Sequence, residues 1–213
     1  MNYREYLQRM IYAAIDPLLR LLLRLHVTPN AVTIAGLAGN AVAAGLFVVA
    51  AQRLDTESTE AYRLVAWGGT VILLAGLMDM MDGRLARLSG LSSRFGALLD
   101  STLDRYSELL TLSGICLLLL HGGDDGLWYG VATFAAIIGS MMVSYVRARA
   151  EGLGIDCKVG LMQRPERVVL TAVAAIVSGA AKSLFWLGTG MAVIALLANL
   201  TAVWRIVHCR KGE

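Results

Sequence analysis

The sequence has few residues that bind metals in soluble proteins, and it carries little charge. Three cysteines and three histidines occur in 213 residues, and charged residues make up 16% of the chain. Cys116, Cys157 and Cys209 lie far apart, so they form neither a disulfide framework nor a metal-binding spacing. No arrangement of charge indicates nucleic-acid binding. Because long linkers, repeats and low-complexity tracts are also lacking, we expect one compact domain.

Apolar residues dominate instead. The chain is 57% hydrophobic and has a mean hydropathy of +0.63, both typical of a membrane protein. A helix needs roughly 20 apolar residues to cross a bilayer, and six stretches fit this length. We therefore predict an all-α integral membrane fold with six transmembrane helices. The expected spans are Thr28–Ala51, Ala61–Arg87, Arg94–His121, Leu127–Glu151, Gln163–Ala181 and Leu184–His208.

The segment before the first span mixes arginines with apolar residues. Arg4, Arg9, Arg20 and Arg24 are interleaved with leucines and isoleucine at helical spacing, which favours an amphipathic helix lying in the membrane interface. A cleaved signal peptide is the alternative, but arginines interrupt the apolar stretch and no small-residue cleavage site follows. We expect an interfacial helix over residues 1–27 and a transmembrane domain over residues 28–213.

Basic residues are concentrated on one side of the predicted membrane domain. With six spans both termini share a side, together with the loops near Arg84–Arg94 and Arg147–Arg167. Of the 19 Lys and Arg residues, Arg53, Arg63 and Lys182 lie on the other side. The positive-inside rule makes the basic side cytoplasmic. We predict a multi-pass protein of the cytoplasmic (inner) membrane, whose basic face meets anionic lipids or phosphorylated substrates.

Four aspartates interrupt the apolar spans. Asp79 and Asp82 are spaced i, i+3, and Asp100 and Asp104 are spaced i, i+4, so each pair lies on one helix face. The short link "LSGLSS" predicts an antiparallel hairpin that brings both pairs to a similar depth. Four carboxylates in a low dielectric repel one another unless protons or cations offset the charge. Hard oxygen ligands suit Mg²⁺ or Mn²⁺, and two ions leave the cluster near neutral.

Glycines and an arginine accompany these acids. Gly83 and Gly96 remove side chains where a bulky ligand approaches the backbone, and Arg87 lies one turn beyond Gly83, where it can bind a phosphate. A proton or ion relay in a transporter is the main alternative. The chain has no internal symmetry and no broken-helix pattern, which disfavours a transporter.

The aspartates, glycines and arginine together match the pattern D-x2-D-G-x2-A-R-x8-G-x3-D-x3-D. This pattern resembles the signature of the CDP-alcohol phosphatidyltransferase family, whose architecture is also six spans after an interfacial helix. The resemblance implies that the hydroxyl of a second substrate displaces CMP from a CDP-linked lipid, with divalent cations on the diphosphate. The matching positions are Asp79, Asp82, Gly83, Ala86, Arg87, Gly96, Asp100 and Asp104.

The same resemblance implies individual roles. Asp79, Asp82 and Asp100 are expected to be the principal metal ligands, and Asp104 the general base that also touches a metal. The stretch "VTPNAVTIAG" resembles the family's entry into the first span, where Thr33 joins the nucleotide site. A purely structural helix start at Thr28 and Pro29 accounts for that stretch equally well. The expected nucleotide-binding residues are Thr33, Gly83, Ala86 and Arg87.

The stretch from Ser144 to Leu170 bears on the acceptor. It is most similar to bacterial members of the family that make phosphatidylinositol phosphate from CDP-diacylglycerol and inositol phosphate, and less so to archaeal members that make inositol-phosphate ether lipids. A cluster of basic side chains suits a dianionic phosphate, although arginines facing lipid headgroups give the same composition. One departure is Arg147, where those enzymes commonly have lysine. The expected acceptor-phosphate residues are Ser144, Arg147, Arg167 and Arg205, with Arg149 and Arg164 less firmly assigned.

Other functions remain open at this stage. The same chemistry with glycerol phosphate, inositol or serine as acceptor is the nearest alternative. An intramembrane prenyltransferase also uses aspartates and Mg²⁺, but it normally has more spans and its acids lie on loops. A non-enzymatic ion carrier is a further alternative. The family resemblance implies a homodimer, and the small residues of "GLAGNAVAAG" in the first span permit close helix contact.

Overall fold

Local sequence signals set the ends of the helices. The computed structural model describes residues 15–211, and the predictions for residues 1–14 lie outside that range. The described part is entirely helical apart from its connections, and residues 15–24 form a helical segment ahead of the bundle. The remaining helices are α2 (Pro29–Arg53), α3 (Ser58–Ser89), α4 (Arg94–Leu120), α5 (Gly126–Gly152), α6 (Arg164–Ala181) and α7 (Phe185–Lys211).

Caps explain where the helices of the site begin and end. The Thr28 hydroxyl accepts a hydrogen bond from Ala31 N at 3.3 Å, and proline follows at the first helical position, so α2 starts as the sequence predicts. Helix α3 ends at Gly90, which adopts a left-handed φ of 69°. Ser93 caps α4 by accepting from Gly96 N at 2.9 Å. The turn between the two helices is therefore short, as expected.

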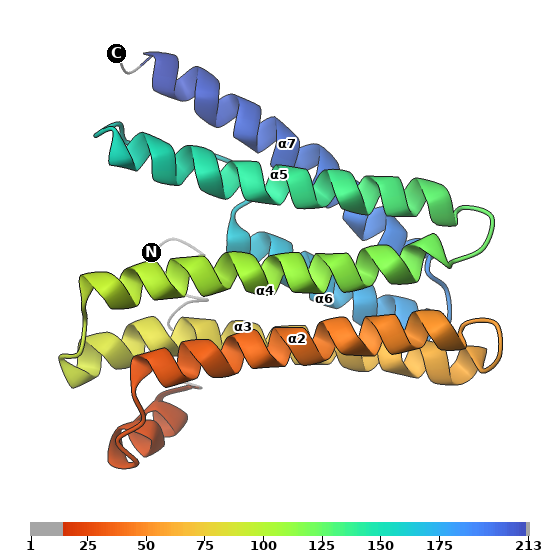
Figure 1. Cartoon of the computed structure of the whole chain (residues 1–213), viewed down its shortest axis with the longest axis horizontal. Helices are drawn as coiled ribbons and strands as arrows, with labels where there is room; N and C mark the ends of the chain where they lie inside the picture. The colour runs from red at the N-terminus through yellow and green to blue at the C-terminus, as the bar shows by residue number, and fades with distance from the viewer. Residues whose placement is uncertain (1–14, 212–213) are drawn as a thin grey trace, which may run out of the picture.

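The connections alternate between the two ends of the bundle (Figure 1). The α3–α4 and α5–α6 connections lie at the left end, with segment 15–24 and the end of α7. The other three connections lie at the right. We call the left end the basic end, because most arginines of the described chain are there. Helix α2 packs on α3 and α4, α5 packs on α4 and α7, and α6 packs on α3 and α7.

Helices α3 and α4 run antiparallel, with α2 packed against both of them. Glycine permits these close contacts. A Cβ at Gly114 of α4 would lie 2.8 Å from Ala44 O of α2, and one at Gly39 of α2 would lie 3.3 Å from the Ala75 Cβ of α3. Gly39 and Ala44 of the first span therefore serve contacts within the chain. Space remains between α3 and α4, and it is there that the site forms.

Four helices, α2, α3, α5 and α7, are long and apolar enough to cross a membrane by length and composition, among the residues the structure describes. Helices α4 and α6 carry the acidic and basic residues of the site, which lower their apolar content. Large apolar side chains face outward around the bundle, including Val42, Leu117 and Val177. An outward apolar surface of this kind suits lipid and identifies an integral membrane fold.

Segment 15–24 docks beside the aspartates. Ile15 and Leu19 are buried against α2 and α3, where Met81 and Leu85 flank the Asp82 turn. Asp16 pairs with Arg84 at 2.9 Å. Leu18 and Leu21 on the same segment, and Leu25 directly after it, are exposed. One apolar side thus packs on the protein and another is left outward.

Candidate active site

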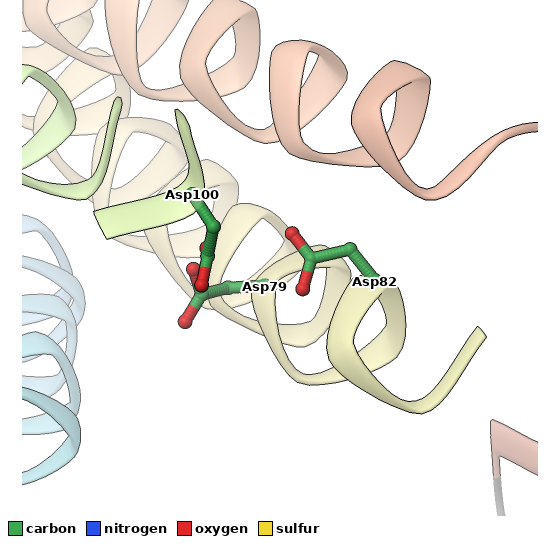
Figure 2. Close-up of side chains that lie close together, drawn as sticks. All are labelled: Asp79, Asp82 and Asp100. Carbon is green, nitrogen blue, oxygen red and sulfur yellow. The ribbon is translucent and has the colours of Figure 1, made fainter. Parts of the chain in front are cut away.

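Three carboxylates from two helices converge at the basic end. Asp79 and Asp82 of α3 and Asp100 of α4 each offer an oxygen, and these oxygens lie within 4.8 Å of one another. Figure 2 shows Asp100 reaching across to Asp79, with Asp82 further along α3. Helical spacing places the two α3 acids on one face, and the short α3–α4 turn brings the third acid opposite them. Oxygen donors grouped in this way fit a hard divalent cation such as Mg²⁺ or Mn²⁺.

Asp82 is the most buried of the three, with an exposed fraction of 4%. The Thr33 hydroxyl of α2 donates to Asp82 Oδ2 at 2.7 Å, and Gly83 N donates to Asp82 Oδ1 at 2.5 Å. A carboxylate with both oxygens hydrogen-bonded is held in one orientation. Thr33, predicted to bind the nucleotide, therefore contacts an acid of the cluster, and it links α2 to the site.

Asp104 lies one turn further along α4 and is linked to the cluster through an arginine. Arg164, the first residue of α6, pairs with Asp104 Oδ1 through Nη2 at 2.7 Å and with Asp79 Oδ2 through Nη1 at 2.5 Å. One guanidinium thus bridges α3 and α4 from α6. From the sequence, Arg164 is predicted, less firmly than others, to bind the acceptor phosphate. In the structure it forms ion pairs with these two acids.

A second ion pair lies one turn deeper. Arg167 of α6 donates to Glu108 of α4 through Nε at 2.6 Å and through Nη2 at 2.9 Å, and to Met162 O through Nη1 at 3.0 Å. The exposed fraction of Arg167 is 2%. Glu108 follows Asp104 by four residues, so both acids lie on the same face of α4.

The other predicted acceptor residues do not join this group. Arg147 pairs with Glu151 on the surface of α5 at 2.9 Å, and Arg149 is exposed. Arg205 is buried and donates to Val143 O and to Val159 O, so it ties α7 to α5 and to the α5–α6 connection. Ser144 is half-buried on α5. Among the predicted basic residues, Arg164 and Arg167 are the ones brought to the acids.

Three of the four predicted nucleotide residues follow Asp82 on α3. A Cβ added at Gly83 would meet Arg87 Nη1 at 3.7 Å, an ordinary contact, so the protein itself leaves room there. Ala86 is half-buried and Arg87 is exposed on the same end of α3. The glycine is therefore not required by packing, and the space beside it is available to a ligand.

A cavity of about 450 Å³ extends inward from Asp79 and Asp104. Its walls come mainly from α2, α3, α4 and α6, and Arg164, Arg167 and Glu108 line it. Asp82 and Asp100 are outside this lining. Ser140 of α5 also lines it, and its hydroxyl is buried without a hydrogen-bond partner among the described residues. A buried polar atom left unpaired is rare in proteins and marks a place where a polar ligand or water binds.

Fold and site together define an integral membrane protein with a carboxylate centre for a divalent cation at one end of its bundle. The profile of the CDP-alcohol phosphatidyltransferase family matches residues 26–206, and the chain belongs to this family. It is a family of enzymes, and the match covers α2 to α6 in full and α7 as far as residue 206.

Individual relatives agree with this assignment. The chain is 37% identical over 202 residues to phosphatidylinositol phosphate synthase of Mycobacteroides abscessus, covering 94% of this chain and 86% of the relative. The crystal structure of Mycobacterium tuberculosis phosphatidylinositol phosphate synthase with CDP-DAG bound superposes with a TM-score of 0.77, at 31% identity, covering 91% of this chain and 92% of that chain. A second structure of that enzyme, with manganese and citrate, also gives 0.77, at 30% identity and with 92% and 89% covered.

Two residues of the site were missed from the sequence. Glu108 carries a readable signal, because it continues the i, i+4 series of Asp100 and Asp104 along one face of α4. Ser140 carries none, since serines are common in membrane helices and their hydroxyls usually bond to the helix backbone.

Proposed function

We propose that the chain transfers the phosphatidyl group of CDP-diacylglycerol to inositol phosphate, releasing CMP and forming phosphatidylinositol phosphate. The observation that carries the proposal is the group of three carboxylates within 4.8 Å of one another, beside a cavity that holds a buried guanidinium. The first element fits a metal-bound diphosphate, and the second fits a phosphorylated acceptor. The names of the relatives support the same donor and acceptor.

Asp79, Asp82 and Asp100 hold the divalent cation in this proposal, and Asp104 contacts a second one. A bound Mg²⁺ or Mn²⁺ supplies charge neutralisation for the diphosphate and makes CMP a better leaving group. The manganese complex of the M. tuberculosis enzyme supports a divalent cation of this kind. Two ions balance the four carboxylates.

Asp104 acts as the general base. It takes the proton of the acceptor hydroxyl while the hydroxyl oxygen bonds to the phosphorus of the phosphatidyl group. The bond from that phosphorus to the CMP oxygen breaks, and CMP leaves with its phosphate. Thr33, Gly83, Ala86 and Arg87 surround the nucleotide.

A basic group holds the acceptor phosphate. Arg167 lines the same cavity as Asp104, which supports a place for the acceptor next to the base. We retain the remaining members of the group as predictions. They are Ser144, Arg147 and Arg205, with Arg149 and Arg164 less firmly assigned.

The protein crosses the membrane six times in this proposal, as a domain over residues 28–213 with an interfacial helix over residues 1–27. Both termini and the site face the cytoplasm, at the basic end, because positive charge is retained on that side. The exposed Leu18 and Leu21 of segment 15–24, and Leu25 directly after it, support contact with the lipid surface. We further propose a homodimer, as the family resemblance implies.

CMP release by the purified enzyme tests the function. With CDP-diacylglycerol and Mn²⁺ or Mg²⁺, we expect CMP release with inositol phosphate and none with inositol, glycerol phosphate or serine. Rapid turnover with glycerol phosphate instead would contradict the acceptor and leave the family chemistry intact. Pyrophosphate as the product would indicate a prenyltransferase, and metal binding without CMP release would indicate an ion carrier.

A further inference from the structure

Glu108 and Arg167 form a buried ion pair with two parallel hydrogen bonds, at 2.6 and 2.9 Å. Their side chains are 8% and 2% exposed. Taking two charges out of water costs more than their attraction commonly returns, so a buried pair is weak evidence for a stabilising role. Stability therefore does not explain why this pair is present. Its position in the cavity indicates a functional reason.

The pair lies across the cavity, parallel to a second pair. Asp104 and Glu108 are one turn apart on α4, and Arg164 and Arg167 are one turn apart on α6. All four side chains line the cavity. Helix α4 packs on α2 and α5 whereas α6 packs on α3 and α7, so these long side chains bridge two helices that have different packing partners.

The hydrogen bonds of Arg167 fix the position of its guanidinium but do not involve all of its N–H groups. A guanidinium has five N–H groups. Glu108 receives one from Nε and one from Nη2, and Met162 O receives one from Nη1. These three bonds fix the plane of the group, and each terminal nitrogen has a second N–H beyond them. Two N–H groups on neighbouring nitrogens match the spacing of two phosphate oxygens.

We propose that Glu108 is a positioning residue for the acceptor phosphate: it neutralises Arg167 within the membrane and orients it so that its remaining N–H groups bind the phosphate. This rests on the proposed function. Glu108 does not touch the substrate and acts only through Arg167. The acceptor is the substrate concerned, because the cavity contains both Asp104 and Arg167. Of the predicted nucleotide site, Thr33 lines the cavity, whereas Gly83, Ala86 and Arg87 do not.

Steady-state kinetics of Glu108 variants test the proposal. Glu108→Gln removes the charge that orients Arg167, and we expect KM for inositol phosphate to rise about 10- to 100-fold, the size of one charge-assisted hydrogen bond. KM for CDP-diacylglycerol and the Mn²⁺-induced rise in Tm should stay at wild-type values. Glu108→Asp retains the charge and should recover most of the acceptor affinity. Asn199→Ala is the control, because Asn199 is a half-buried polar link between α7 and α5 through Ala135 O, at 3.0 Å.

A charge swap separates orientation from stability. The variant Glu108→Arg with Arg167→Glu retains a pair, and so should recover Tm relative to Glu108→Gln, but it moves the guanidinium to α4 and should not recover KM for the acceptor. Arg167→Gln with and without Glu108→Gln completes a double-mutant cycle. If Glu108 acts through Arg167, the double variant has the same acceptor KM as Arg167→Gln alone.

Several outcomes would overturn the inference. A swap variant with wild-type acceptor KM, or effects of Glu108→Gln and Arg167→Gln that multiply, would show that Glu108 does not act through Arg167. If Glu108→Gln and Glu108→Asp both lowered Tm and left KM for both substrates unchanged, the pair would have a structural role only. These results leave the proposed function standing if the wild type turns over inositol phosphate. A wild type that releases no CMP with any acceptor overturns both.

Discussion

Gly83 lies where the protein has room for a side chain. A substitution there can therefore affect substrate binding without lowering the stability of the fold. A Cβ there meets Arg87 Nη1 at 3.7 Å. Because alanine favours a helix by about 1 kcal/mol over glycine, Gly83→Ala should preserve or raise Tm. It should nevertheless raise KM for CDP-diacylglycerol by at least about tenfold, since one misplaced methyl group costs about 1–3 kcal/mol in a tight site. Gly69→Ala is the opposite control, because its Cβ would lie 2.6 Å from Ala172 O. Gly69→Ala should lower Tm. A wild-type KM for CDP-diacylglycerol in Gly83→Ala would show that the nucleotide does not bind at this position.

Asp104 and Asp100 have different proposed roles although they share a helix face. Asp104→Asn retains the size of the side chain but cannot accept a proton, so turnover should fall by at least about 100-fold while CDP-diacylglycerol still raises Tm. Asp100→Asn alters the three-carboxylate group and should weaken the Mn²⁺-induced rise in Tm instead. Appreciable CMP release by Asp104→Asn would contradict its assignment as the base.

Ser140 offers the cleanest test of the cavity. Its hydroxyl is buried without a partner among the described residues, so Ser140→Ala should leave Tm unchanged or slightly raised. If the acceptor binds there, KM for inositol phosphate should rise about tenfold, the cost of one lost hydrogen bond. Ser178→Ala is the matched control. Ser178 is equally buried, but its hydroxyl accepts from Leu187 N at 2.8 Å, so its removal should lower Tm and leave KM unchanged.

These residues differ in how far a sequence determines them. The meeting of Asp79, Asp82 and Asp100 follows from helical spacing and a short turn, both of which are local. The bridge from Arg164 depends on where α6 lies relative to α3 and α4, which no local pattern specifies. The predicted convergence of Arg147 and Arg205 on one pocket likewise depends on how distant helices pack. In the structure Arg147 pairs with Glu151, and Arg205 bonds to the α5–α6 connection.

At the scale of helices, α2 holds the site open. The hairpin of α3 and α4 was predictable from "LSGLSS", but the packing of α2 against both helices was not, because it depends on which glycine faces meet. Gly114 is a close contact between α2 and α4, with its Cβ position 2.8 Å from Ala44 O. Thr33 lies on the same helix, α2, and bonds to Asp82, so a shift of α2 would move it relative to the acids of the cluster.

Gly114→Val should therefore push α2 away from α4. Overpacking of this kind costs about 1–3 kcal/mol, so Tm should fall. The Mn²⁺-induced rise in Tm should also shrink, because the Thr33 bond to Asp82 is disturbed. Gly45→Val is the control on the same helix pair, since no atom lies within 4 Å of its Cβ position. Equal effects of both variants would show that side-chain volume alone is responsible.

For the whole molecule, the sequence predicts six spans, and helices occur at all six places. Two of them, α4 and α6, carry the two ion pairs that line the cavity. Inward pairing of Asp104 with Arg164 and of Glu108 with Arg167 offsets the charge that would oppose insertion. Length and composition alone therefore identify α2, α3, α5 and α7 as candidate membrane spans. They do not identify α4 and α6, whose polar residues face one another.

Labelling with a membrane-impermeant thiol reagent distinguishes six spans from four. In a background with Cys116, Cys157 and Cys209 replaced by serine, single cysteines are introduced at the exposed positions Ser92, Asp124, Lys158 and Lys182. Six spans place residues 92 and 158 in the cytoplasm and residues 124 and 182 outside. Intact cells should then label only the second pair, and inside-out vesicles only the first. Residues 92 and 124 labelled from the same side would show that α4 does not cross, and residues 158 and 182 labelled together would show the same for α6. The reverse pattern at all four positions would retain six spans and place the basic end, with the aspartates, outside the cell.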